Sequence, residues 1–185
     1  MTEFSDAELL QMFHEPDGQR KHYVFNLLVK KYQQRVYQHV RRIVIDHSDA
    51  DDMVQNTFIK VWNNLEHFRE ESQLFTWIYR IATNECLALL RQRRRRFMLP
   101  IHDVEHELTN KLASQESPIN ADKLEMRLHQ AILKLPQKQR LVFNLRYFDE
   151  MKYEDMSNIL GTSVGALKAS YHHAVQKVEK YLTEF

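Results

Sequence analysis

The residues best suited to chemistry lie in segment 102–106, which reads HDVEH. His102 and His106 flank Glu105 in the H-x-x-E-H pattern, in which two histidines one helical turn apart hold zinc and the glutamate acts as a base. The segment begins two residues after Pro100 and has no sustained apolar period, so a rigid metal-binding helix is not expected there. A zinc hydrolase is therefore kept only as an alternative, and we predict neither a metal nor any other cofactor.

Three further carboxylates, Asp49, Asp51 and Asp52, could suggest a divalent-cation site. They fall in the first turn of a predicted helix, where carboxylates commonly interact with the helix dipole. The sequence contains no glycine-rich phosphate loop and no Ser/His/Asp or Cys/His arrangement that stands out. We therefore predict a protein that is not an enzyme.

Residues 153–174, YEDMSNILGTSVGALKASYHHA, include Gly161, one of only three glycines in the chain. Gly161 separates two apolar-periodic segments, so we expect it to end the first helix in the left-handed conformation. This spacing is typical of a helix-turn-helix, although a hairpin that serves packing only remains open. The second helix then presents outward residues able to contact DNA: Ser163, Lys168, Ala169, His172, His173 and Gln176.

Residues 68–96 combine aromatic rings with cations, which is what a single nucleic-acid strand needs for its bases and its phosphates. The alternative is a helix whose rings all lie in the core and whose arginines are merely solvated. The face predicted to lie outside the core comprises Thr76, Arg80, Thr83, Asn84 and Arg91, beside Phe68, Trp77 and Tyr79.

The elements that must position these residues are predicted to be helices throughout. The 185 residues include four prolines and three glycines, and no stretch alternates apolar and polar residues long enough to indicate a sheet. The single cysteine, Cys86, suits a reducing compartment and is expected in the core. The acidic N-terminus is unlike a signal sequence and no stretch is long and apolar enough to cross a membrane, so we expect a cytoplasmic protein without membrane insertion.

Apolar periodicity divides the chain into two small helical domains. The first, residues 1–96, contains four predicted helices, and a capping box at Ser48–Asp51 is expected to open the third. Residues 97–121 are predicted to form an extended acidic linker. The second domain, residues 122–185, begins with a helix ending before Pro136, which is expected to be the first residue of the next helix.

Three blocks of this sequence resemble sigma-70-family sigma factors of the extracytoplasmic function (ECF) group. They are DADDMVQNTFIKVWNNLEHF (49–68), FTWIYRIATNECLALLRQRRRR (75–96) and LPQKQRLVFNLRYFDEMKYEDMSNILGTSVGALK (135–168), in the right order and spacing. The resemblance implies a sigma-2-like four-helix bundle and a sigma-4-like helix-turn-helix domain. One departure is the loop Arg69-Glu70-Glu71-Ser72, where the group usually carries Arg-Gly-Glu-Ser.

The resemblance also implies a function and its partners. Such a protein binds core RNA polymerase at the beta-prime coiled coil and the beta flap, opens the minus-10 element, reads the minus-35 element and is monomeric when free. An anti-sigma factor is a further implied partner. The implied polymerase contacts are Asp51, Asp52, Gln55, Asn56, Ile59 and Lys60. The implied minus-10 contacts are Phe68, Arg69, Thr76, Trp77, Arg80, Thr83, Asn84 and Arg91, and the helix-turn-helix residues given above would contact minus-35 DNA.

The competing binding function is a helix-turn-helix regulator that binds DNA alone as a dimer. That function predicts a stable dimer and a DNA footprint without polymerase, whereas a sigma factor is expected to be monomeric and to bind promoter duplex poorly by itself. The net charge of +1 favours poor binding to promoter duplex by the isolated protein, because proteins that bind DNA unaided usually carry an excess of positive charge.

Overall fold

A computed structural model describes residues 4–15, 18–97 and 123–183 of this chain. Helices make up all the regular secondary structure of these residues, which confirms the predicted all-α fold. The predicted linker, apart from Phe97, lies outside the described residues, and so does the HDVEH segment. No helix in the described ranges has the length and apolar character needed to cross a bilayer.

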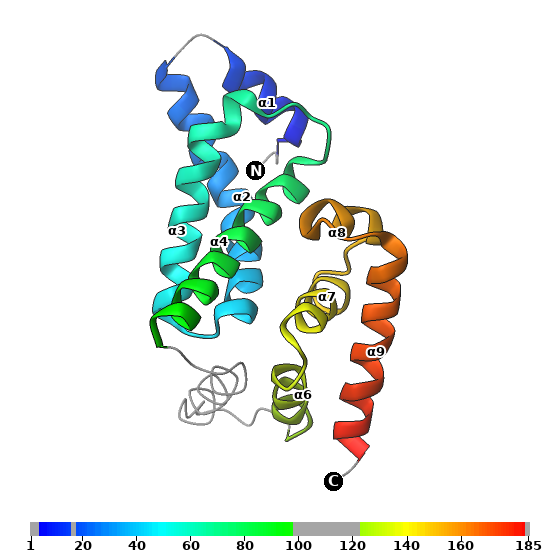
Figure 1. Cartoon of the computed structure of the whole chain (residues 1–185). Coiled ribbons are helices and arrows are strands. Elements are labelled where there is room, and N and C mark those ends of the chain that lie inside the picture. Colours follow the sequence, from blue (N-terminus) through cyan, green and yellow to red (C-terminus); the bar gives the residue numbers. More distant parts are fainter. Residues whose placement is uncertain (1–3, 16–17, 98–122, 184–185) are drawn as a thin grey trace.

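The first half of the chain is a bundle of four helices (Figure 1). They are α1 (Asp6–His14), α2 (Gly18–Val44), α3 (His47–Asn64) and α4 (Leu74–Phe97), and the short 3-10 helix η1 (Leu65–His67) follows α3. Their inward residues form one apolar core, as the helical periodicity predicts. Cys86 is buried in that core, and burial raises the pKa of its thiol to about 12.

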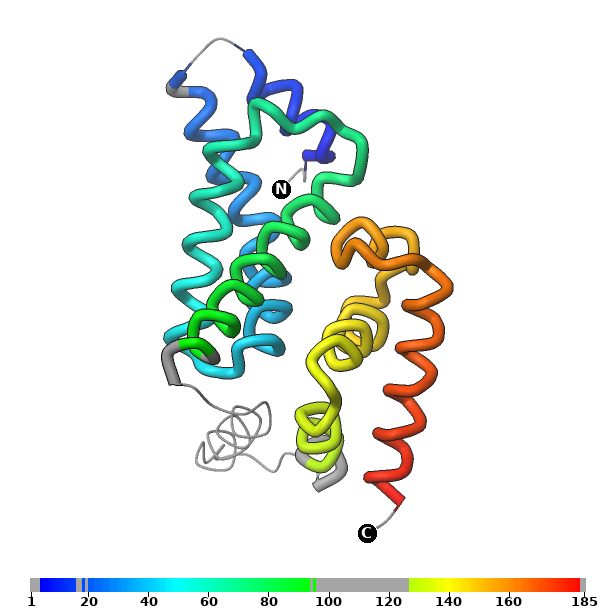
Figure 2. The backbone as a smooth tube through the Cα atoms, viewed as in Figure 1, coloured from blue at the N-terminus to red at the C-terminus, as the bar shows by residue number. Residues whose placement is uncertain are grey.

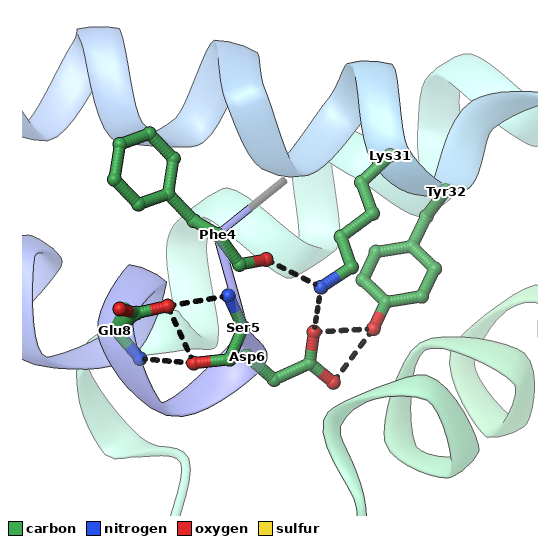
Figure 3. A network of polar contacts seen from close by, with 6 residues as sticks. All are labelled: Phe4, Ser5, Asp6, Glu8, Lys31 and Tyr32. Atoms are coloured by element: carbon green, nitrogen blue, oxygen red, sulfur yellow. Dashed lines mark hydrogen bonds and ion pairs between the residues drawn. The ribbon is translucent and has the colours of Figure 1, made fainter. Parts of the chain in front are cut away.

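Helix α1 is fixed to α2 by the polar network that Figure 3 shows. Ser5 caps α1 through a capping box with Glu8. The Tyr32 hydroxyl donates to the Asp6 carboxylate at 2.7 Å, and the Lys31 ammonium lies 2.7 Å from the same carboxylate. Burial and the neighbouring Asp6 raise the pKa of the Tyr32 hydroxyl, so the phenol stays protonated and remains a donor.

The start of α3 differs from the prediction. Its N-cap is Asp46, whose side chain accepts from the Asp49 amide at 3.2 Å, and not the predicted box at Ser48–Asp51. The cap comes earlier because α2 ends at Val44 and Ile45 turns the chain with a φ of 67°. Asp46 is then the first residue whose extended backbone lets its side chain reach the amides of the new helix.

The second half contains α6 (Lys123–Leu133), α7 (Gln137–Tyr147), α8 (Tyr153–Leu160) and α9 (Val164–Thr183). Gly161 ends α8 with a φ of 61°, and its amide donates to the Ser157 carbonyl at 2.9 Å. The predicted left-handed glycine is therefore confirmed. Pro136 is the N-cap of α7 instead of its first residue, because its backbone is still extended (ψ of 141°).

The two helical domains of the predicted fold pack against each other. Helix α8 packs against α4 and α7 contacts α2, and one continuous cluster of buried residues includes both the first bundle and α7 to α9. Figures 1 and 2 show α9 on the far side of α7 and α8 from the first bundle. The helix-turn-helix is thus half covered: its first helix lies in the interface, and the outward face of its second helix remains exposed.

Candidate nucleic-acid interface

A pocket of about 300 Å³ opens beside the N-terminal end of α4. It lies against the rings of Phe68 and Trp77, whose centroids are 5.0 Å apart. Arg69 and Arg80 add two cations to its wall. Flat rings beside guanidinium groups can stack an unpaired base and hold its phosphate, so this pocket has the chemistry predicted for the strand-binding face.

Three residues assigned to that face from the sequence are buried in the structure. Thr76 and Thr83 are each 1% exposed, so their predicted exposure is wrong, and Tyr79, which the prediction puts beside that face, is fully buried. Thr83 lies 2.9 Å from the His39 ring nitrogen of α2, and that imidazole stacks on Tyr79. The prediction failed because α4 contacts α2, α3 and α8, so most of its circumference is covered.

The remaining predicted strand-binding residues divide into two groups. Phe68, Arg69, Trp77 and Arg80 line the pocket together with the buried Thr76. Asn84 and Arg91 are exposed further along α4 without lining it. Sequence reasoning missed four lining residues: His67, Glu71, Ser72 and Asn158. The first three flank the aromatic motif and could have been found by proximity, whereas Asn158 comes from α8 and no local pattern indicates it.

The loop beside the pocket is strained at one residue. Glu70 has a φ of 55°, in the left-handed region that side chains other than glycine rarely adopt. It occupies the position at which the family resemblance leads one to expect glycine. The structure therefore gives a conformational reason for that expectation.

A second concave surface lies between α2 and α3. This groove has a volume of about 490 Å³ and is mostly apolar, with Phe25, Val29, Phe58 and Trp62 among its lining residues. Ile59 stands at its edge with 51% of its surface exposed, so it extends the apolar surface of the groove toward solvent. All six residues predicted to contact polymerase are exposed, and three of them line the groove: Asp51, Gln55 and Ile59.

The carboxylates considered as a cation site have other roles. Asp49 pairs with Arg93 of α4 at 2.5 Å, which links the start of α3 to the end of α4. Asp51 and Asp52 are exposed. Within the described ranges, no group of three or more His, Cys, Asp or Glu side chains is placed to hold a metal ion.

The outward face of α9 carries the predicted duplex-reading residues. All six are exposed: Ser163, Lys168, Ala169, His172, His173 and Gln176. The Ser163 hydroxyl accepts from the Ala166 amide at 3.4 Å and so caps the helix. The Lys168 ammonium lies over the Tyr153 ring at 5.7 Å, which brings the two helices of the helix-turn-helix together beside this face.

Comparison with known proteins identifies the family. The chain matches the Sigma-70 region 2 family over residues 28–96 and the Sigma-70 region 4 family over residues 125–178. It is 33% identical to the RNA polymerase sigma-H factor of Pseudomonas aeruginosa, with 98% of this chain and 96% of that protein covered. It is 30% identical to the ECF RNA polymerase sigma-E factor of Haemophilus influenzae, with 96% and 95% covered.

Solved structures share the fold. The chain is similar to CnrH, solved in complex with the cytosolic domain of CnrY, with a TM-score of 0.67, 24% identity and 94% of each chain covered. It is also similar to the sigma factor RpoE of Bartonella quintana, solved in complex with the anti-sigma factor NepR, with a TM-score of 0.64 and 20% identity. That match covers 85% of this chain and 96% of RpoE.

The chain therefore belongs to the sigma-70 family of RNA polymerase sigma factors, and within it to the ECF group. It is a sigma factor that directs promoter-specific initiation of transcription, and it is not an enzyme. The resemblance proposed from the three sequence blocks is confirmed.

Proposed function

We propose that this sigma factor docks on core RNA polymerase through the groove between α2 and α3 and its α3 rim. The observation that carries the proposal is the exposed Ile59 beside a mostly apolar groove whose edge holds Asp51 and Gln55. Such a surface suits a helical partner that inserts apolar side chains and pairs its cations with the rim. The contacts on α3 are Asp51, Asp52, Gln55, Asn56, Ile59 and Lys60, and α2 contributes Phe25 and Val29. By family resemblance, the partner is the beta-prime coiled coil.

The pocket beside α4 is proposed to hold an unpaired base of the minus-10 element. Phe68 and Trp77 provide the stacking surface, and Arg69 and Arg80 provide charge for the backbone. Asn84 and Arg91 lie further along the same helix and would follow the strand. Thr76 and Thr83 are proposed to support the helix from below, since both are buried.

The α9 face is proposed to read the minus-35 element in duplex DNA through the six exposed residues described above. A helix presenting Lys168, His172 and Gln176 one turn apart can donate hydrogen bonds to base edges or phosphates. The domains that carry the two functions are proposed to be residues 1–96 and 122–185, joined by residues 97–121. The second domain would also contact the polymerase beta flap.

The remaining partners follow from the family. The similar CnrH and RpoE structures were each solved with a bound protein, which for RpoE is the anti-sigma factor NepR. We therefore propose that an anti-sigma factor binds this chain, that the free chain is a monomer, and that it acts in the cytoplasm.

The polymerase contact is tested by Asp52→Arg and Asn56→Arg. Both residues are exposed on α3, so the fold should survive, while a bulky cation in the contact should abolish association with purified core polymerase in a pull-down. Glu71→Arg is the matched control, because it makes the same charge change as Asp52→Arg at an exposed position outside the groove between α2 and α3. A folded Asp52→Arg protein that still binds core polymerase would remove α3 from the interface.

Initiation itself is tested by run-off transcription with core polymerase, purified sigma factor and genomic promoter fragments. Discrete transcripts that depend on added sigma factor are expected. A footprint made by a dimer of the chain without polymerase would instead support the stand-alone regulator.

A further inference from the structure

Helix α2 is basic along its whole length. Lys and Arg recur through its 27 residues, and it contains no Asp or Glu. The neighbouring helix α3 instead begins with carboxylates, at Asp49, Asp51 and Asp52. The formal net charge of +1 for the chain therefore conceals a separation of positive and negative charge between adjacent helices.

Carboxylates of other elements pair with several of the α2 cations. The pairs are Arg20 with Glu15, Lys21 with Glu66, Lys31 with Asp6, and Arg42 with Asp149. Lys30 and Arg35 lie in the middle of the helix and are exposed, and in the described part of the chain no carboxylate pairs with either of them. Two exposed cations without a counter-ion can bind an anion from outside the molecule.

Lys30 and Arg35 belong to one exposed face of α2. With 3.6 residues per turn, Lys30, Gln34 and Gln38 follow one another along the helix axis, and Arg35 stands beside them. All four side chains are exposed. Their ammonium, guanidinium and amide groups all donate hydrogen bonds, and side chains of these types commonly bind the phosphate oxygens of nucleic acids. We call Lys30, Gln34, Arg35 and Gln38 the α2 basic face.

The α2 basic face lies between the groove and the α4 pocket. Gln33, which precedes Gln34 in the chain, lines the groove between α2 and α3. On the other side, the Arg35 guanidinium lies over the Phe75 ring of α4 at 4.2 Å, and Trp77 of the α4 pocket follows two residues later. Helices α2 and α4 pack side by side along the first bundle (Figure 2). A promoter strand held in the α4 pocket therefore brings the adjoining DNA close to this face.

The chemistry of the α2 basic face favours duplex DNA over other polyanions. Unpaired bases stack on aromatic rings, and none of the four residues has a ring, so the face suits a duplex backbone better than a single strand. A helix that binds membranes inserts its apolar residues into the lipid, whereas the apolar residues of α2, such as Leu28 and Val36, are buried in the core. A protein interface has an apolar centre, and this face has none.

We propose that the α2 basic face binds the phosphate backbone of the duplex DNA that flanks the opened minus-10 segment. Lys30 and Arg35 each neutralise one phosphate, and Gln34 and Gln38 donate hydrogen bonds to the same backbone. The contact is independent of base sequence, because every base pair presents the same phosphates, and it fixes the position of the duplex beside the pocket. This inference rests on the proposed function of the α4 pocket, which brings the promoter to this side of the bundle.

The test compares holoenzymes made from core polymerase and four full-length sigma proteins: wild type, Lys30→Gln, Lys30→Gln with Arg35→Gln, and Arg20→Gln. Glutamine removes the charge and keeps a polar side chain. Arg20→Gln is the matched control, because it removes a cation of the same helix that already pairs with Glu15 at 2.5 Å. Circular dichroism and a pull-down with core polymerase check each protein before DNA is added. Lys30→Gln alone carries the test if the double variant does not fold.

Fluorescence anisotropy measures DNA binding over a series of salt concentrations with two labelled probes. The first is a promoter fragment, found by run-off transcription, whose minus-10 segment is made non-complementary and is flanked by duplex on both sides. The second is a single-stranded oligonucleotide that carries the non-template minus-10 sequence alone. Each neutralised phosphate contributes about 0.9 to the slope of log K against log salt. For the first probe, we expect the slope to become shallower by about 0.9 for Lys30→Gln and by roughly 1.8 for the double variant. The second probe should bind all four holoenzymes equally, and Arg20→Gln should match wild type on both.

Equal slopes for all four holoenzymes on the duplex-flanked probe would overturn the proposal. An equal loss on both probes would also overturn it, because the cations would then contact the single strand, and so would loss of polymerase binding by Lys30→Gln, which would assign the face to a protein interface. Phe68→Ala tests the α4 pocket separately and should weaken binding of both probes. If Phe68→Ala weakens both while Lys30→Gln changes neither, only this inference is wrong. If Phe68→Ala changes neither, the proposed pocket is wrong.

Discussion

The positive φ of Glu70 predicts backbone strain that a single substitution can measure. A left-handed φ costs a residue other than glycine roughly 1–2 kcal/mol, whereas glycine costs about 0.5–1 kcal/mol through the entropy of the unfolded chain. Glu70→Gly should therefore raise the free energy of unfolding by about 0.5–1 kcal/mol, because φ at this residue is 55°. Urea denaturation followed by tryptophan fluorescence measures the change.

Glu71→Gly supplies the control for that prediction. It makes the same substitution one residue further along the loop, where the backbone does not have a positive φ. It should lower the stability by about 0.5–1 kcal/mol, because only the entropic cost remains. Equal losses at both positions would show that Glu70 is not strained.

At the scale of the element, the turn between α8 and α9 depends on one glycine. Gly161 has a φ of 61°, and a Cβ built there meets no atom within 4 Å, so steric crowding by neighbours does not explain the glycine. Gly161→Ala should therefore lower the unfolding free energy by about 1–2 kcal/mol through backbone strain alone. Thermal and urea unfolding of the variant measure this loss.

Gly165→Ala is the matched substitution inside α9, where a Cβ also meets nothing within 4 Å. Alanine is favoured over glycine in a helix, so this change should stabilise the protein by up to about 1 kcal/mol. The free energy of unfolding should therefore fall for Gly161→Ala and rise for Gly165→Ala. A fall for both variants would point to a cause other than the backbone angle φ.

At the scale of the molecule, the shared apolar cluster predicts that the halves unfold together. Both tryptophans, Trp62 and Trp77, lie in the first bundle, so their fluorescence reports mainly the unfolding of that half. Leu135 lies in the second half, is 1% exposed and belongs to a cluster formed by α6, α7 and α9. Leu135→Ala should cost about 2–5 kcal/mol, and it should lower the tryptophan-reported midpoint if the halves are coupled.

Leu28→Ala in α2 is the positive control, because it removes a side chain of similar burial from the first bundle itself. An unchanged tryptophan midpoint for Leu135→Ala, together with a lowered midpoint for Leu28→Ala, would mean that the two halves unfold independently. The packing of the two halves against each other would then contribute nothing to the stability of the first bundle.

The sequence by itself determined the features that depend on a few neighbouring residues. Helix periodicity placed the exposed faces of α3 and α9, and the scarcity of glycine located the turn at Gly161. These predictions succeeded because no other helix covers these faces. The 3.6-residue helical period alone then decides which residues of α3 and α9 are buried and which are exposed.

Only the tertiary structure decided what surrounds α4. Thr76, Tyr79 and Thr83 read as an outer face from periodicity, but helices on several sides cover them. The partners that cover or complete this face are distant in the chain: Asp155 is 79 residues from Thr76 in sequence, and Asp149 is 107 residues from Arg42. No local sequence pattern encodes such pairings, because they form only when the two folded bundles pack against each other. That packing depends on the sum of many contacts across both surfaces.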